Sequence, residues 1–218
     1  QPDRERPNAQ NLEAVAAQIR STSTRVRDAL SAGQIPLVLG GDCTIELGVV
    51  AAFLASGERV GLLYFDKHAD LNVPAAVPEG ALDWMGLAHL LGEGDALPEL
   101  SRLGPRHPML AAEDVLVFGH RIARATARAA RIDEPVLQRR ALKTVSDIAV
   151  ARDPEGTAAA ALDTLLTPGG RLLIHFDVDV IDFTDAPLSE ETGRNEGLTL
   201  EQAFRALRVF TAHPAFTA

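Results

Sequence analysis

Apolar and polar positions follow two different periodicities along the chain, which predict strands and helices in turn. Short, mainly apolar runs, typical of strands buried on both faces, occupy residues 35–39, 60–65, 115–119 and 171–176. Apolar residues recur with helical spacing over residues 12–32, 45–56, 82–91, 121–130, 156–166 and 200–210. This alternation predicts an α/β fold with three layers, α/β/α, and a mainly parallel sheet. The length of 218 residues fits a single domain over residues 1–218 with a substantial core.

Two acidic segments follow two of the predicted strands. Asp66, His68 and Asp70 come directly after residues 60–65, and Asp177 and Asp179 come directly after residues 171–176. Alternate residues of an extended segment share a face, and open parallel sheets bind ligands at the carboxyl ends of their strands. We therefore expect the side chains of each segment to converge at that edge of the sheet.

Buried carboxylates in such number need charge compensation, because an uncompensated buried charge is very costly. Carboxylate and imidazole ligands favour Mn, Zn or Fe, and a two-metal site can activate water at neutral pH. The alternative is that the acids cap helices and form turns. Two acidic segments at matching strand ends, with a third polar turn at Asp42 and Cys43, favour the metal site.

The overall charge limits the class of partner. A net charge of −9 and a pI of about 5.1 argue against nucleic-acid and anionic-membrane partners, and suit a cationic small molecule. The single cysteine, Cys43, excludes an intramolecular disulfide and fits a reducing compartment. The first residues lack the apolar core of a signal peptide, and the apolar runs are too short to span a bilayer. These features predict a cytoplasmic location, while the oligomeric state is left open.

Three motifs together resemble those of the arginase–agmatinase family of ureohydrolases. That family carries a Gly-Gly-Asp-His turn, an Asp-x-His-x-Asp motif and a Phe-Asp-Val-Asp motif in this order. The matching segments here are Gly40 to Cys43, Asp66 to Asp70, and Phe176 to Asp179 followed by Asp182. The resemblance runs from about Pro36 to Leu200. Family members usually have a further strand before it and a strand and helix after it, so we expect terminal or loop segments of the family to be missing here.

The resemblance implies two divalent metal ions, usually manganese, and hydrolysis of a C–N bond in a guanidino compound. Asp66 and Asp177 would bridge the ions, Cys43 and Asp70 would complete the first site, and His68 and Asp179 the second. Asn72 falls where arginases place an asparagine that meets the α-carboxylate of the substrate. Asp70 is the nearest candidate to take a proton from the attacking water and pass it to the leaving amine.

Two positions depart from the family near the metals. Cys43 stands in place of a metal-binding histidine, and a soft thiolate suits Zn or Co better than Mn. The alternative is that Cys43 is a buried, inert residue. Asp83 occupies the register of the proton-shuttling histidine of arginases. Asp83 would carry protons if its pKa were raised, or it would cap the following helix.

A third departure concerns the guanidinium site. Arginases hold the guanidinium with a glutamate, whose register gives Gln202 here, with Glu201 beside it. Thr199 and Gln202 also form a Thr-x-x-Gln capping box, which is a purely structural alternative. His175 has the same strand parity as Asp177 and could support the metal ligands through a hydrogen bond, but a packed core histidine is the favoured interpretation.

A neutral amide suits a guanidine that is less basic than arginine. With a cysteine in place of the histidine, the chain resembles the family members that convert Nω-hydroxy-L-arginine to hydroxyurea and L-ornithine in D-cycloserine biosynthesis, an antibiotic pathway. The alternatives are an arginase, agmatinase or guanidinobutyrase that releases urea, or a binding protein of ureohydrolase fold that has lost turnover.

Overall fold

The computed structural model describes residues 6–121, 130–189 and 192–218, which fall into two compact units. The helical unit comprises the residues up to 60, residues 70–111 and residue 218, and the sheet unit comprises residues 61–69 and 112–217. The single domain over residues 1–218 stays a prediction. The expected helix over residues 121–130 lies largely outside the described residues.

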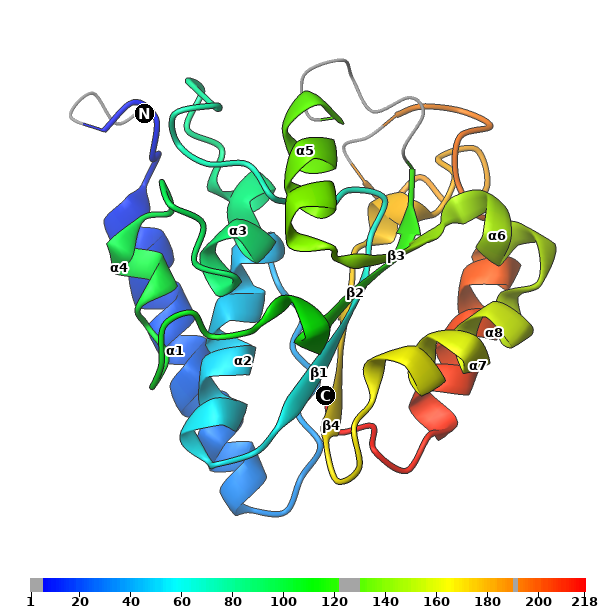
Figure 1. Cartoon of the computed structure of the whole chain (residues 1–218), viewed down its shortest axis with the longest axis horizontal. Helices are drawn as coiled ribbons and strands as arrows, with labels where there is room; N and C mark the ends of the chain where they lie inside the picture. Colours follow the sequence, from blue (N-terminus) through cyan, green and yellow to red (C-terminus); the bar gives the residue numbers. More distant parts are fainter. Residues whose placement is uncertain (1–5, 122–129, 190–191) are drawn as a thin grey trace. The chain divides into compact units, whose positions relative to one another are not determined.

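The helical unit is built around two packed helices, α1 and α2 (Figure 1). Its elements are α1 (Leu12–Ser31), η1 (Cys43–Ile45), α2 (Glu46–Ala55), η2 (Leu82–Met85), α3 (Gly86–Leu90) and α4 (Pro98–Ser101). Helix α1 ends just before Gly33, which has a φ of 69° and donates its N–H to the carbonyl oxygen of Leu30. The three predicted helices of this unit are confirmed, with residues 82–91 split between η2 and α3.

The apolar segment 35–39 is not a buried strand, so that prediction is wrong. Ile35, Leu37 and Leu39 are 61%, 85% and 87% exposed, and no strand is assigned here. A strand needs a neighbour for its backbone hydrogen bonds, and Pro36 removes one of the donors. The described sheet has the order β3-β2-β1-β4 and does not include residues 35–39. The apolar run alone could not reveal that this segment has no partner strand there.

The sheet unit carries the four strands of that sheet, β1 (Val60–Phe65), β2 (Val115–His120), β3 (Lys143–Ser146) and β4 (Arg171–Phe176). Its helices are η3 (Ala112–Asp114), α5 (Ala130–Arg140), α6 (Asp147–Arg152), α7 (Pro154–Leu165), η4 (Val178–Val180) and α8 (Leu200–Ala212). Strand β2 runs parallel to both β1 and β3, as predicted for a parallel sheet. Strands β1, β2 and β4 and helices α7 and α8 of this unit were predicted, whereas β3 and helices α5 and α6 were not.

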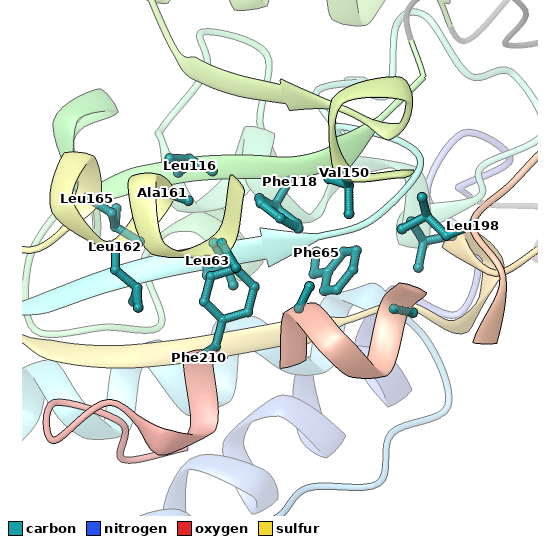
Figure 2. Close-up of a cluster of buried hydrophobic side chains, with 14 of the residues drawn as sticks. Leu63, Phe65, Leu116, Phe118, Val150, Ala161, Leu162, Leu165, Leu198 and Phe210 are labelled. Carbon is teal, nitrogen blue, oxygen red and sulfur yellow. The ribbon is translucent and has the colours of Figure 1, made fainter. Parts of the chain in front are cut away.

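One face of the sheet packs against helices α7 and α8 through a cluster of aromatic and aliphatic side chains (Figure 2). Phe65 meets Phe118 edge to face, with ring centroids 4.9 Å apart, and Phe118 meets Phe210 of α8 in the same manner at 5.1 Å. Because side chains alternate along a strand, Tyr64 and Asp66 point to the opposite face from Phe65. The apolar cluster therefore fixes which face receives the acids. Among the described residues, none of the helices is long and apolar enough to cross a membrane.

Candidate metal centre

The two acidic segments begin side by side at the ends of β1 and β4. Asp66 follows β1, and its N–H donates to the carbonyl oxygen of Phe118 at 3.0 Å. Asp177 follows β4, and its N–H donates to the carbonyl oxygen of Phe65 at 2.9 Å. These bonds continue the sheet one residue beyond the strands, so both carboxylates are presented at the carboxyl edge where ligands bind in such folds.

The same local turn then brings in the second donor of each segment. The Asp66 Oδ1 atom accepts the N–H of His68 at 2.6 Å, and the Asp177 Oδ1 atom accepts the N–H of Asp179 at 2.8 Å. A carboxylate that accepts the N–H two residues ahead forces the chain to turn back on itself. Both acids are therefore turn formers, as the structural alternative predicted. In each case only one carboxylate oxygen accepts that bond.

The two turns place His68 against Asp179. The His68 Nδ1 atom lies 2.9 Å from the Asp179 Oδ2 atom and 3.7 Å from the Asp66 Oδ1 atom. The donor atoms of Asp66, His68 and Asp179 all lie within 4.8 Å of one another. The structure thus brings together three of the predicted ligands from both segments.

A further histidine lies at the same edge. The donor atoms of Asp66, His175 and Asp177 also lie within 4.8 Å of one another. His175 is 9% exposed and its Nε2 atom lies 3.7 Å from the Asp66 Oδ2 atom, so it belongs to the acidic site and not to a purely apolar core. Its parity with Asp177 was the signal in the sequence for this placement.

Burial makes the charge at this site costly in the absence of a cation. Asp66 is 1% exposed, and burial, together with the neighbouring carboxylates of Asp179 and Asp177, raises its pKa to about 7. Among the described residues, the buried Asp66 Oδ2 and Asp179 Oδ1 atoms accept no hydrogen bond. Buried carboxylate oxygens that accept no hydrogen bond are expected to bind cations.

The donor set fits divalent transition metals. Three carboxylates and two imidazoles suit Mn²⁺, Zn²⁺ or Fe²⁺ better than the all-oxygen sites preferred by Mg²⁺ and Ca²⁺. The residues of the sheet unit that could hold the ions are Asp66, His68, His175, Asp177 and Asp179.

Several predicted site residues belong to the helical unit, and their roles stay predictions. Cys43 is buried in η1, directly after Asp42, whose Oδ1 atom accepts the N–H of Thr44 at 2.9 Å. Asp70 is 4% exposed with a φ of 46°, a left-handed conformation that is rare for a residue other than glycine. Asn72 is 2% exposed.

Asp83, the second candidate for proton transfer, lies within η2. The N-cap positions of η2 and α3 are Ala81 and Met85, so Asp83 occupies neither of them. Its role as a proton carrier stays a prediction.

The predicted capping box at the start of α8 is confirmed. The Gln202 N–H donates to Thr199 Oγ1 at 3.2 Å, and the Gln202 Oε1 atom accepts the Thr199 N–H at 2.8 Å. The Gln202 Nε2 atom also donates to the carbonyl oxygen of Ala151 at 3.0 Å. Both ends of this amide are thus engaged by the protein, and Glu201 beside it is exposed. A substrate role for either residue stays a prediction.

The chain is similar in sequence and in fold to known arginases. The arginase of Bacillus caldovelox is 32% identical over 177 residues, covering 81% of this chain and 57% of that protein. The arginase of Brevibacillus brevis is 36% identical over 117 residues, covering 54% of this chain and 39% of that protein. The chain thus spans little more than half the length of the first of these relatives.

The solved structure of the Bacillus caldovelox arginase matches 99% of this chain and 69% of its own, with a TM-score of 0.85 and 25% identity. This match confirms the predicted arginase-like α/β class. The family model described as Arginase family matches residues 5–217, and the chain therefore belongs to the arginase family.

Proposed function

We propose that this chain carries the binuclear metal centre of a hydrolase that cleaves a C–N bond of a guanidino compound. The observation that carries the proposal is the convergence of Asp66, His68 and Asp179, with Asp177 and His175 beside them, at the carboxyl edge of the sheet. Membership in the arginase family supports the reaction class. The pairing of strand-end carboxylates with imidazoles supports two ions, and we propose Mn²⁺ as the physiological metal.

Bound divalent cations would supply Lewis acidity, which lowers the pKa of water and stabilises negative charge that develops on the guanidino group. The protein holds this charge-rich site rigid through the two turns that Asp66 and Asp177 form. We propose that Cys43 and Asp70 contribute further ligands from the helical unit.

The reaction combines addition of water, cleavage of a C–N bond and proton transfer. Water adds to the guanidino carbon, the C–N bond to the amine breaks, and the proton lost by water moves to the leaving nitrogen. We propose that the Asp70 carboxylate accepts this proton and returns it to the amine, with Asp83 as the second group that exchanges protons with solvent. The products are an amine and urea, or a substituted urea.

For the substrate we propose Nω-hydroxy-L-arginine, which would give hydroxyurea and L-ornithine. Asn72 would bind the α-carboxylate, and Glu201 and Gln202 would lie near the guanidino group. The neutral amide of Gln202 supports a guanidine that is often uncharged, because an amide holds a full cation less well than a carboxylate does. The second candidates are arginine, agmatine and guanidinobutyrate. A cytoplasmic location is also our proposal, and it rests on the reducing environment that Cys43 suggests.

A panel of guanidines tests the proposal. Mn-loaded protein is incubated with L-arginine, Nω-hydroxy-L-arginine, agmatine and guanidinobutyrate, and amine and urea-type products are measured together with the bound metal. Turnover of the hydroxylated substrate, with close to two ions per chain, supports the proposal. Turnover of arginine or agmatine alone supports the family reaction and overturns the substrate. Absence of turnover, with metal well below one ion per chain, overturns the hydrolase and favours a binding protein.

A further inference from the structure

Asp66 lies between two imidazoles, one at each of its carboxylate oxygens. The Oδ1 atom is 3.7 Å from the Nδ1 atom of His68, and the Oδ2 atom is 3.7 Å from the Nε2 atom of His175. His68 follows β1 and His175 lies on β4, so the two rings approach the carboxylate from different strands. A carboxylate that is flanked in this way can bridge two ions, each with its own imidazole.

The distance of 3.7 Å between His175 Nε2 and Asp66 Oδ2 bears on whether His175 is a hydrogen-bond partner of Asp66 or a metal ligand beside it. Hydrogen bonds between nitrogen and oxygen have lengths of about 2.7–3.2 Å, so this pair is too far apart to be held by a hydrogen bond alone. With metal–ligand bonds of about 2.1 Å, two donors of one tetrahedral ion lie roughly 3.4 Å apart. The observed separations, 3.7 Å on the side of His175 and 3.7 Å on the side of His68, are close to this value.

The ring of His175 is also held in a fixed plane. It stacks on the ring of Tyr64, with centroids 4.1 Å apart and an angle of 8° between the planes. Tyr64 is fully buried on β1, next to β4 in the sheet, and lies two residues before Asp66. The stack therefore fixes the plane in which the Nε2 atom meets the site. Such support is typical of a ligand whose orientation is set before the metal binds.

We propose that His175 is a metal ligand. Its Nε2 atom would hold one divalent ion together with Asp66 and Asp177, and His68 would hold the other together with Asp66 and Asp179. This inference rests on the metal centre of the proposed function. With His175 as a ligand, the ion held by Asp66 and Asp177 would have a nitrogen donor whether or not Cys43 is also a ligand.

The test counts imidazoles at the metals and does not depend on turnover. In protein loaded with Co²⁺, each bound imidazole whose second nitrogen carries a proton gives a strongly shifted, exchangeable proton NMR signal. We expect two such signals from the unmodified protein, one of which disappears in His175→Gln and the other in His68→Gln. His213→Gln is the matched control, because His213 lies after α8 and accepts the Ala215 N–H through its Nδ1 atom.

Metal titration supplies a second measurement. Loss of a partner that only orients a ligand costs about 10–100-fold in metal affinity, and loss of a ligand costs at least as much. We expect His175→Gln to weaken one of two binding events by tenfold or more and His213→Gln to weaken neither.

The outcomes distinguish this inference from the proposed function. Two bound ions with a single imidazole signal in the unmodified protein overturn the role of His175 and leave the hydrolase intact. Two signals that both persist in His175→Gln also overturn the role of His175 as a ligand. Failure of the unmodified protein to bind metal overturns both proposals. The signal count in the unmodified protein requires no variant, so a folding defect in His175→Gln leaves the inference falsifiable.

Discussion

The backbone N–H of Asp177 donates to the carbonyl oxygen of Phe65 at 2.9 Å. This single bond aligns two acidic segments that are distant in the sequence, because Asp66 is the next residue after Phe65. It also joins the metal site to the apolar cluster, since the Phe65 side chain packs against Phe118 and Phe176. Packing on one face of the sheet thus sets the position of ligands on the other.

The close pair of His68 and Asp179 leads to a prediction about metal affinity. Asp179→Asn removes the charge that faces the His68 Nδ1 atom at 2.9 Å. We expect metal affinity to fall by about a hundredfold or more, because a carboxylate ligand is lost. The measurement is a calorimetric titration with Mn²⁺ or Zn²⁺. Asp163→Asn is the control, since Asp163 is exposed on α7, and equal affinities in the two variants would contradict the assignment.

The raised pKa of Asp66 predicts an unusual dependence of stability on pH in metal-free protein. The ordinary pKa of 3.8 applies to the unfolded chain, and the pKa of about 7 applies to the fold. Between these values the folded protein binds more protons, so the free energy of unfolding should decrease as pH rises from 4 to 7. The expected loss from this group is on the order of a few kcal/mol.

Denaturant unfolding of chelator-treated protein between pH 5 and 8 measures this effect. Asp66→Asn should be the more stable protein at pH 8 and should show a flatter profile. Saturating Mn²⁺ should reverse the trend in the unmodified protein, because the metal binds the ionised carboxylate. Identical profiles for Asp66→Asn and the unmodified protein would refute the burial of a titrating charge at this position.

Much of the site could be predicted from local rules. Strand alternation predicts that Asp66 and His68 share a face, although a turn formed by Asp66 is what brings His68 to the site. The carboxyl-end rule for parallel sheets predicts Asp177 at the same edge. The start of α8 at Leu200 agrees with the Thr199 and Gln202 capping box. The first and the last of these features depend on residues within a few positions of one another, and the placement of Asp177 depends only on the direction of parallel strands.

The remaining features depend on neighbours that are remote in the sequence. The parity of His175 with Asp177 was visible in the sequence, but its stacking on Tyr64 depends on β4 lying beside β1. The apolar run at residues 35–39 has strand character without a strand partner in the described sheet. Strand β3 has four residues, which is too short for a periodic signal, and gains its structure by pairing with β2.

Cys43 is the position at which the chain departs most clearly from the metal-binding histidine of arginases. If the thiolate is a ligand, Cys43→His should bind Mn²⁺ more tightly, by about tenfold, because imidazole suits Mn²⁺ better than a soft thiolate does. Competitive titration with a metallochromic dye measures the affinity. Co²⁺ should also produce a sulfur-to-metal charge-transfer band in the unmodified protein and not in Cys43→Ser. Absence of that band and an unchanged Mn²⁺ affinity would show that Cys43 is an inert buried residue.

Gly119, near the end of β2, connects the packing of the sheet unit to its metal ligands. Its φ is 87°, and an added Cβ atom would lie 2.8 Å from Val180 Cγ2 and 3.1 Å from the Phe65 ring. The left-handed conformation costs roughly 1–2 kcal/mol in a residue with a side chain, and the overlap adds about 1–3 kcal/mol. We therefore expect Gly119→Ala to lower the free energy of unfolding by about 2–5 kcal/mol in denaturant titrations.

Gly57→Ala is the matched control for this substitution. Gly57 has a similar φ of 78°, but nothing lies within 4 Å of an added Cβ atom, so only the conformational cost of roughly 1–2 kcal/mol applies. Because Val180 follows Asp179 and Phe65 precedes Asp66, Gly119→Ala should also weaken metal binding, whereas Gly57→Ala should not. Equal destabilisation by the two substitutions, with metal affinity unchanged in both, would mean that the contact between Gly119 and Val180 does not position the ligands.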